Sequence, residues 1–455
     1  MANFKILVVG DVVADERYDI KCDRVDQTTP IPVYQISTTP NDVRYGGAAL
    51  IARQLGKYGA DVDLVCFERL KYAPGEGVSV AISHRRPPRI RRRYYSRDGA
   101  LLARHDITPR EYHALPATAL GELRHEVEYL LGAYAYDAIV LADYGGDAVG
   151  AAAVAFRGVT TPIYIDPHSK GDFHRYPPST AIFPNSDEAA VMQLRLGVED
   201  TETLAYQLNT ERLIITSPRG AITSDGQSVL TRQRQVCDSV GAGDVLTASY
   251  VMAELFGLEP KTALEFASAA ATAACDNVGP CPISLFDAWG EYIAGDIQRK
   301  ILSPKLSLTF GPQLAKVFPT TNGVFDLMHV GHIALLTEAR NRYMSPAFVL
   351  VNDDASAREN KGYSRPIIPL QQRMFSLAAL ESVAAVTSFS SRTAQQILRQ
   401  LKPRLYFKGP GYTPTGIPEG STVAACGGDF CSIAPKPPVS CSTTELVARI
   451  KEIDL

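Results

Sequence analysis

Short apolar runs, each ending in a polar or glycine-containing segment, recur along the chain with helical patterns between them. Runs rich in Val, Ile and Leu occupy residues 5–11, 137–145, 162–167, 180–185 and 212–220. Apolar residues at helical spacing fill residues 46–59 and 200–210. Buried strands that alternate with helices favour a parallel sheet with helices on both faces. The sequence therefore predicts an α/β fold.

The alternation stops and then begins again near residues 300–315, where Pro, Ser and Gly interrupt the pattern. Beyond this break we expect a strand and turn at 316–323, a helix at 331–343, a strand at 347–354 and a helix at 370–383. The chain has 455 residues, which is too long for one ordinary core. We therefore predict a first domain over residues 1–305 and a smaller α/β domain over residues 316–455.

Composition excludes several classes of protein. The net charge is −3, so the total charge gives no electrostatic reason to bind nucleic acid or an anionic membrane. A local basic run, "HRRPPRIRRR" at 84–93, favours a strand whose arginines meet phosphate or solvent, and nucleic-acid binding is the alternative. No stretch has the uninterrupted apolar length of a membrane span. The eight scattered cysteines include no CxxC pair and indicate a reducing, cytoplasmic location.

Polar residues stand where several predicted strands end. They are Asp11, Asp143, Asp166 and Asn185. In open parallel sheets, ligands bind beyond the carboxyl ends of the strands. We therefore expect these four side chains at a binding site.

A glycine-containing turn precedes a long apolar helix at "DSVGAGDVLTASYVMAEL". Glycines Gly241 and Gly243 would let backbone N–H groups approach an anion at the positive end of the helix dipole. Asp244, just inside that turn, could take a proton from a hydroxyl while the amides hold a phosphoryl group. The alternative is a tight turn in which Asp244 is only a favourable residue at a helix start.

These residues, with "NSDE" at 185–188 and "GGAA" at 46–49, resemble the ribokinase, or PfkB, family of sugar kinases. The resemblance implies a ribokinase-like doubly wound sheet with a small lid. Asp244 would be the general base and Gly241, Ala242 and Gly243 the anion hole. Asn185 and Glu188 would lie near Mg²⁺–ATP, with Glu188 as a metal ligand, directly or through water. The implied sugar-binding residues are Asp15, Gly46, Gly47, Arg104, Asp143 and Asp166.

The second unit begins with "TNGVFDLMHVGH" at 321–332. His329 and His332 are three residues apart at the start of a predicted helix, so they can face the same way. Imidazoles beside free backbone N–H groups suit a triphosphate, and nucleotidyl transfer needs alignment and positive charge on the leaving pyrophosphate. Two alternatives are an unrelated buried and surface pair, and a metal-binding pair, for which the sequence offers no third ligand.

The same stretch resembles the cytidylyltransferase-like nucleotidyltransferases, which have a smaller Rossmann-like fold. The resemblance implies that His329 and His332 are catalytic and that further residues bind the nucleotide and its phosphates. Those residues are Thr321, Asn322, Gly323, Phe325, Lys361, Arg373, Lys408, Ser442, Thr443 and Thr444.

The order of the two units resembles the family of bifunctional heptose 7-phosphate kinases/heptose 1-phosphate adenylyltransferases. The resemblance implies phosphorylation of O1 of D-glycero-β-D-manno-heptose 7-phosphate, removal of the 7-phosphate by a separate phosphatase, and transfer of AMP from ATP to give ADP-heptose. It also implies Mg²⁺ as cofactor and a homodimer formed through the lid-like stretch at 18–36.

Several positions depart from that family's pattern. Leu50 replaces a sugar-binding Asn, and Gly146 and His168 stand where lysines are expected. Gly411 replaces an acid. These changes predict an altered sugar more than an altered reaction. One alternative is a non-catalytic kinase domain that serves as a dimer platform for an active transferase. Another is a sugar-sensing regulator, although no DNA-binding motif is present.

Overall fold

The computed structural model describes residues 4–435, apart from 30, 72–74, 98, 113–114 and 233–235. It also describes residues 446, 447, 449 and 452. It divides into two compact units, Met1–Ala288 and Trp289–Leu455. The first unit ends earlier than the predicted domain limit of 305. Trp289 is buried among residues of the second unit, where its Nε1 donates to the carbonyl of Ala384 (3.0 Å) and its ring lies 5.4 Å from that of Phe310.

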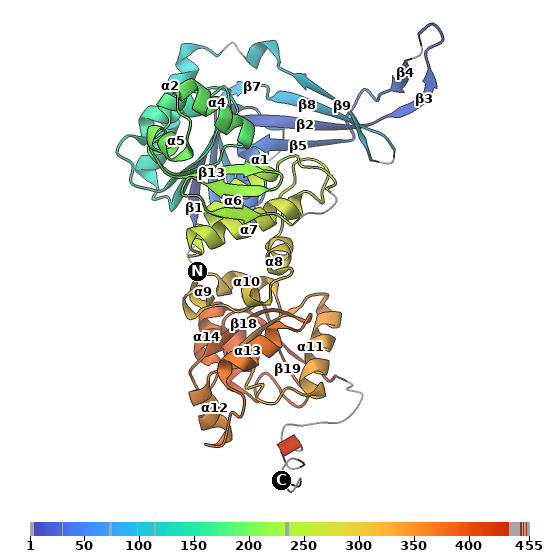
Figure 1. Ribbon diagram of the computed structural model, residues 1–455, viewed down its shortest axis with the longest axis vertical. Helices are drawn as coiled ribbons and strands as arrows, with labels where there is room; N and C mark the ends of the chain where they lie inside the picture. Colours follow the sequence, from blue (N-terminus) through green and yellow to red (C-terminus); the bar gives the residue numbers. More distant parts are fainter. Residues whose placement is uncertain are drawn as a thin grey trace. The chain divides into compact units, whose positions relative to one another are not determined.

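The first unit is built on a nine-stranded sheet (Figure 1). In spatial order its strands are β15 (Ser228–Leu230), β14 (Gly220–Thr223), β13 (Thr210–Ser217), β12 (Ser179–Ile182), β11 (Ile163–Asp166), β10 (Ala138–Ala142), β1 (Lys5–Gly10), β6 (Asp61–Glu68) and β7 (Val78–Arg86). The strands from β13 to β7 are parallel, while β14 and β15 form an antiparallel edge. The predicted parallel sheet is confirmed.

Helices cover both faces of this sheet. On one face, side chains such as Leu7 and Val9 pack in a core with residues of α2 (Ala117–Ala133), α3 (Ala148–Ala152), α4 (Ser186–Leu196) and α5 (Thr201–Gln207). The other helices of the unit are α1 (Ala48–Lys57), α6 (Ala242–Leu255), α7 (Pro260–Ala274) and α8 (Leu285–Ile293), which runs across the division between the units. Five successive residues of β1, from Ile6 to Gly10, are buried, because a strand covered on both faces alternates its side chains between two cores.

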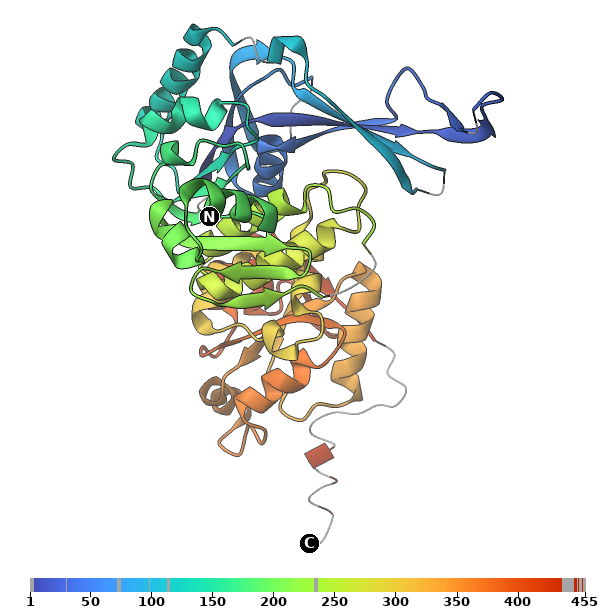
Figure 2. The same cartoon turned by 45° about the horizontal axis from the view of Figure 1, so that its top comes forward.

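A second, four-stranded sheet forms an arm that projects from the first unit (Figures 1 and 2). Its strands, in spatial order, are β5 (Asp42–Gly47), β2 (Val12–Asp19), β8 (Arg89–Tyr95) and β9 (Leu101–Ile107). A hairpin of β3 (Lys21–Val25) and β4 (Pro32–Gln35) lies at the far end of the arm. We call the four strands the lid sheet. The basic run predicted as one strand is divided between β7 and β8 by Pro87 and Pro88, because proline cannot donate to a ladder.

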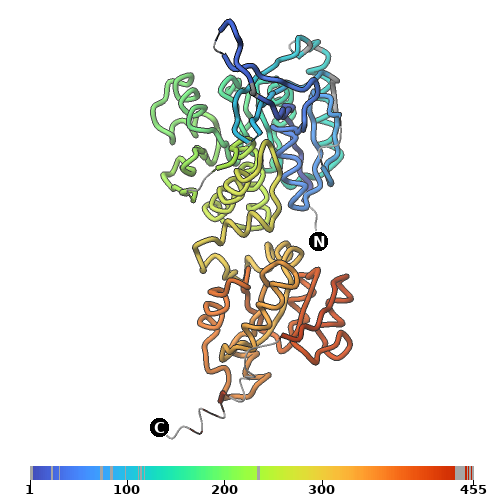
Figure 3. Tube along the Cα trace, turned by 90° about the vertical axis from the view of Figure 1, so that its right-hand side faces the viewer, coloured from blue at the N-terminus to red at the C-terminus, as the bar shows by residue number. Residues whose placement is uncertain are grey.

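The second unit has a five-stranded parallel sheet in the order β18 (Val383–Phe389), β17 (Ala347–Asn352), β16 (Thr320–Gly323), β19 (Leu405–Lys408) and β20 (Asp429–Ser432). Its helices are α9 (Pro304–Thr309), α10 (Gly311–Val317), α11 (Val330–Tyr343), α12 (Asp354–Lys361), α13 (Leu370–Ala378), α14 (Gln395–Leu401) and α15 (Pro418–Ala425). The strand predicted from residue 316 begins only at Thr320, because α10 continues to Val317. Figure 3 follows each unit as a trace.

Local signals explain where several helices begin. Asn185 and Glu188 form a reciprocal capping box at the start of α4, and Asp200 and Asp353 accept N–H bonds at the starts of α5 and α12. No helix in the described part of the chain combines the length and apolar character needed to cross a membrane.

Candidate active sites

The first candidate site lies at the start of α6. Gly241 caps this helix in the left-handed region, with φ 81°, and Ala242 and Gly243 open the first turn. The first N–H groups of an α-helix have no acceptor within the helix, and the helix dipole adds partial positive charge there. The N–H groups of Gly241 and Gly243 are therefore placed as donors of an anion site next to Asp244, while Ala242 donates its N–H to the carbonyl of Ser239 (3.2 Å).

Asp244 is 3% exposed and is held at both carboxylate oxygens. Tyr144 donates its hydroxyl to Oδ1 (2.6 Å), and Gly47, at the end of β5, donates its N–H to Oδ2 (3.2 Å). Burial raises the pKa of Asp244 to about 6. A carboxylate with its pKa near neutrality and a fixed orientation is suited to general-base work.

The strand-end residues meet at one edge of the sheet. Asp11 accepts the N–H groups of Tyr144 (3.0 Å) and Gly146 (2.8 Å), so it fixes the loop after β10. Asp143 accepts the N–H of Gly145 (2.7 Å) and the hydroxyl of Tyr176 (2.7 Å).

Asp166 ends β11 beside Asp244. Burial, followed by the charges of Asp244 and Glu188, raises the pKa of Asp166 well above its usual range. The structure thus brings three predicted residues, Asp143, Asp166 and Asp244, into one acidic environment.

Asn185 and Glu188 lie at the start of α4. Each side chain accepts an N–H of the other residue, at 2.9 and 3.0 Å. Burial raises the pKa of Glu188, and the charge of Asp143 adds to this rise. The negative charge of Glu188 therefore adds to that of the strand-end acids Asp143 and Asp166. One of its carboxylate oxygens accepts the N–H of Asn185 in the capping box.

Two predicted sugar-binding residues on the lid sheet are already ion-paired. Asp15 is buried and pairs with Arg93 (2.8 Å). Arg104 pairs with Asp106 (2.5 Å), and the two side chains are 45% and 55% exposed. The structure therefore places Arg104 on an exposed part of the lid sheet, where its guanidinium pairs with Asp106.

The structure shows what surrounds Leu50 and Gly146, two residues that differ from the family's pattern. Leu50 is fully buried, and its Cδ2 lies 2.5 Å from where a Cβ on Gly241 would be, so a methyl group packs directly on the proposed anion hole. A Cβ on Gly146 would lie 2.1 Å from the hydroxyl of Tyr112 and 2.4 Å from Asp11 Oδ1. No side chain, and so no lysine, fits at position 146 without displacing these groups.

Sequence reasoning missed Tyr144 and the buried ion pairs behind its loop. Arg86 is 2% exposed, lies 2.6 Å from Glu68 and 3.5 Å from Asp11, and donates to the carbonyl of Gly146. The motif "DYGGD" contained Tyr144, but nothing local indicates that its hydroxyl would reach a residue 100 positions away.

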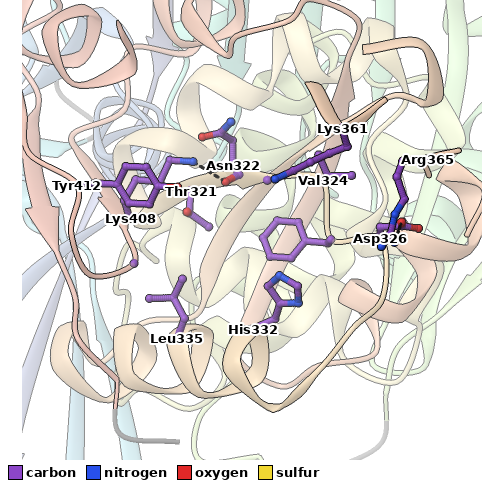
Figure 4. Close-up of a pocket in the computed structure, with 13 residues that line it drawn as sticks. Thr321, Asn322, Val324, Asp326, His332, Leu335, Lys361, Arg365, Lys408 and Tyr412 are labelled. Atoms are coloured by element: carbon purple, nitrogen blue, oxygen red, sulfur yellow. Dashed lines mark hydrogen bonds and ion pairs between the residues drawn. The ribbon is translucent and has the colours of Figure 1, made fainter. Parts of the chain in front are cut away.

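The second candidate site is a cavity of about 450 Å³ in the second unit (Figure 4). This volume is in the range of small-ligand pockets. Seven of the predicted residues line it: Thr321, Asn322, Gly323, Phe325, His332, Lys361 and Lys408. Val324, Asp326, Leu335, Arg365, Gly409 and Tyr412 complete the lining.

The two histidines stack at the start of α11, with ring centres 3.9 Å apart. His329 caps the helix and accepts the N–H of Gly331 at Nδ1 (3.1 Å), so in the neutral ring its proton is on Nε2. Burial, followed by the charge of His329, lowers the pKa of His332 to about 4. His332 Nδ1 is buried and has no hydrogen-bond partner among the described residues. The side chain of His332 therefore lines the cavity as a neutral imidazole, with its Nδ1 enclosed in the protein.

Lys408 supplies a partly buried cation to the lining of the same cavity (Figure 4). It donates to the carbonyl of Asn322 (2.8 Å), and burial lowers its pKa to about 8. Asn322 accepts a hydrogen bond from Tyr406 at Oδ1, and Thr321 donates to the carbonyl of Phe407 (2.8 Å). These contacts fix the end of β16, and the Thr321 hydroxyl is used inside the protein.

Arg373 does not line the cavity, which differs from the expectation that it binds the nucleotide. Its guanidinium donates to the carbonyls of Val324 (2.5 Å), Asn352 (2.9 Å) and Ile368 (2.9 Å), and it pairs with Asp354 (2.7 Å). Because its donors are used inside the protein, Arg373 supports the loops around the site. Ser442, Thr443 and Thr444 lie outside the described residues.

Comparison with known proteins follows the same division. A family model described as pfkB family carbohydrate kinase matches residues 137–285, and one described as cytidylyltransferase-like matches residues 320–431. The bifunctional protein HldE of Escherichia coli O9:H4 is 30% identical over 475 aligned residues, which cover 98% of this chain and 97% of that protein. The chain belongs to the HldE family of bifunctional proteins.

Other HldE relatives show the same full-length similarity. Those of Granulibacter bethesdensis and Edwardsiella ictaluri are 27% and 29% identical, with 99% and 98% of this chain and 99% and 97% of the relatives covered. Among solved structures, phosphofructokinase-2 from Escherichia coli in complex with substrates and products is 14% identical, with a TM-score of 0.48. That match covers 64% of this chain and 98% of the other.

HldE membership confirms the predicted fold class and both predicted activities. The first unit is a carbohydrate kinase of ribokinase-like α/β fold, and the second is a nucleotidyltransferase. Asp244 lies within the kinase match, and both histidines and the described cavity residues lie within the transferase match. The alternative of a sugar-sensing regulator is not supported by these matches.

Proposed function

We propose that the first unit phosphorylates O1 of D-glycero-β-D-manno-heptose 7-phosphate and that the second joins AMP to heptose 1-phosphate, giving ADP-heptose and pyrophosphate. A separate phosphatase would remove the 7-phosphate between the two steps. The observation that carries the proposal is that this chain, which aligns with HldE over its full length, has a buried carboxylate at a helix start in one unit and a cavity lined by a histidine and lysines in the other.

In the kinase step, Asp244 takes the proton from the anomeric hydroxyl as its oxygen attacks the γ-phosphorus of ATP, and ADP leaves. The N–H groups at Gly241, Ala242 and Gly243 stabilise the charge on the transferred phosphoryl group. Tyr144 and Gly47 keep the carboxylate oriented, as their hydrogen bonds to it indicate.

In the transferase step, an oxygen of the sugar 1-phosphate attacks the α-phosphorus of ATP and pyrophosphate leaves. Such a reaction depends on alignment and on charge stabilisation. His332 and Lys408 are placed on two walls of the cavity, where they would hold the triphosphate. Lys361, from the end of α12, adds a further cation to the lining. The proposed donor is ATP; CTP is the competing nucleotide.

Mg²⁺ fits the kinase site. Magnesium is commonly held by one or two carboxylates together with substrate phosphates and water. Glu188, whose carboxylate interacts with Asp143 and Asp166, would provide such a ligand. When bound, the ion would supply positive charge to the ATP phosphates.

The proposal includes a cytoplasmic homodimer. The hairpin at the end of the lid sheet exposes apolar side chains: Val25, Ile31, Tyr34 and Ile36 are 42–58% exposed. Exposed apolar groups that gather on one hairpin are typical of an interaction surface. Six cysteines of the described part of the chain are free thiols, which supports a reducing compartment. A non-catalytic kinase platform is not favoured, because Asp244 and Glu188 are both retained in the acidic site.

Mass spectrometry of the products would test the proposal. The full chain is incubated with ATP or CTP and a panel of sugar phosphates and sugar 1-phosphates. We expect a heptose bisphosphate from heptose 7-phosphate and ADP-heptose from heptose 1-phosphate. Formation of neither product from any member of the panel would contradict the proposal.

Leu50 gives a prediction about the efficiency of the kinase step. Leu50 cannot replace the hydrogen bonds of an Asn amide, and an unpaired substrate hydroxyl is strongly disfavoured. We expect heptose 7-phosphate to react less efficiently here than in relatives with Asn, and Leu50→Asn to raise kcat/KM by about 10-fold or more. Side-by-side kinetics check this. Full efficiency in the unchanged enzyme would show that other residues supply the contact.

A further inference from the structure

The lid sheet carries arginines in a regular alternation along β8. Side chains two residues apart lie on one face of a strand, so Arg89, Arg91 and Arg93 share a face and Arg92 lies on the other. Arg93 pairs with Asp15 (2.8 Å), and Arg92 pairs with Glu16 (2.8 Å). The guanidinium of Arg91, in contrast, makes no ion pair or hydrogen bond with any residue that the structure describes.

Arg91 is only partly exposed and lies near the kinase base. Its guanidinium carbon is 5.8 Å from the ring centre of Tyr144, whose hydroxyl donates to Asp244. Burial raises the pKa of Asp244, and the charge of Arg91 acts in the opposite direction. An arginine without a carboxylate partner is therefore held beside the site of phosphoryl transfer.

Two further donors lie around the same tyrosine. Arg89 donates through Nη2 to the carbonyl of Tyr144, and its buried Nε has no hydrogen-bond partner among the described residues. His168 accepts the N–H of Lys170 at Nδ1 (3.1 Å), so the neutral ring carries its proton on Nε2. The rings of His168 and Tyr144 are 6.4 Å apart.

The nearby acids are committed to other partners. Asp11 accepts N–H groups of the Tyr144–Gly146 loop and lies 3.5 Å from Arg86, while Asp143 accepts from Gly145 and Tyr176. Position 146 itself has no room for a cationic side chain. An anion bound beside this loop would therefore draw its positive charge from the lid sheet.

We propose that Arg91, assisted by Arg89 and His168, forms the subsite that binds the phosphate of a phosphorylated sugar acceptor above Tyr144. Guanidinium groups bind phosphate through paired, charge-assisted hydrogen bonds, and an unpaired arginine loses no internal partner when it does so. The inference rests on the proposed kinase function. It names the residues that would make the kinase prefer a phosphorylated sugar to an unphosphorylated one.

The test compares Arg91→Gln with Arg92→Gln in the full chain. Arg92 is the matched control, since it is a neighbouring arginine on the opposite face. Kinetics are measured with heptose 7-phosphate, with the same heptose lacking the phosphate, and with varied ATP. We expect Arg91→Gln to raise KM for heptose 7-phosphate about 10- to 100-fold, with little change for the unphosphorylated heptose or for ATP. Arg91→Lys should recover part of the loss, and Arg92→Gln should resemble the unchanged enzyme.

Other outcomes separate this inference from the proposed function. Equal losses with both acceptors, or a rise confined to the KM for ATP, would overturn the phosphate subsite while leaving the kinase in place. If the unchanged enzyme phosphorylates neither heptose, the proposed function fails. Calorimetric titration with inorganic phosphate then still decides the subsite: weaker binding by Arg91→Gln than by Arg92→Gln supports it, and equal binding overturns it.

Discussion

Asp244, the proposed general base of the kinase, has a pKa that is set by its burial. Burial raises its pKa to about 6, and a general base must be unprotonated to act. We therefore expect kinase kcat/KM to rise as pH increases through about 6 and to level off above it. Asp244→Asn keeps the shape but removes the base, so kinase turnover should fall about 100-fold or more. Coupled assays of both activities check this, and unchanged phosphorylation in the variant would show that the base is misassigned.

A change at His332 should affect the transferase activity and leave the kinase activity in place. Its pKa of about 4 keeps the free enzyme's imidazole neutral from pH 5 to 8, so its titration should not shape the transferase pH profile in that range. His332→Ala removes a group that we propose to bind the triphosphate, and the expected cost is about 3 kcal/mol in transition-state stabilisation. Nucleotide-sugar synthesis should collapse while phosphorylation continues. Equal loss of both activities would indicate misfolding instead.

At the scale of elements, α12 and α13 each carry a cationic side chain near the cavity of the second unit. Lys361 of α12 lines the cavity, whereas Arg373 of α13 does not. Arg373 of α13 is 1% exposed and binds three carbonyls and Asp354, so it joins the loops after β16 and β17 to both helices. Arg373→Met leaves those acceptors unpaired and should reduce the stability of the second unit by about 3 kcal/mol. Lys361→Met, at the cavity, should weaken nucleotide binding without that loss. Thermal unfolding and nucleotide titration of both variants check this, and equal stabilities would contradict the assignment.

At the scale of the whole molecule, the two active units are joined in one chain, but the proposed chemistry does not require direct transfer between them. The phosphatase must act on the intermediate, so the intermediate has to leave the kinase site. A mixture of Asp244→Asn and His332→Ala proteins, supplied with ATP, heptose 7-phosphate and a phosphatase, should therefore form ADP-heptose at a rate comparable to that of the unchanged enzyme. Each variant alone is the control, and failure of the mixture would indicate transfer within one chain.

The sequence by itself determined the α/β class, the strand-end acids, the helix starts at Gly241 and His329, and most of the transferase cavity. These features depend on short-range patterns: strand and helix periodicity, capping residues and motifs that fold locally. Ser442 to Thr444 stay a prediction. Only the tertiary structure decided that the Tyr144 hydroxyl reaches Asp244 and that Leu50 packs on Gly241. It also decided that the guanidinium of Arg373 is fully hydrogen-bonded inside the protein, whereas that of Arg91 has no ion pair or hydrogen bond with the described residues. Each of these depends on partners distant in the chain, such as the 100 positions between Tyr144 and Asp244, and no local pattern specifies which distant groups a buried side chain meets.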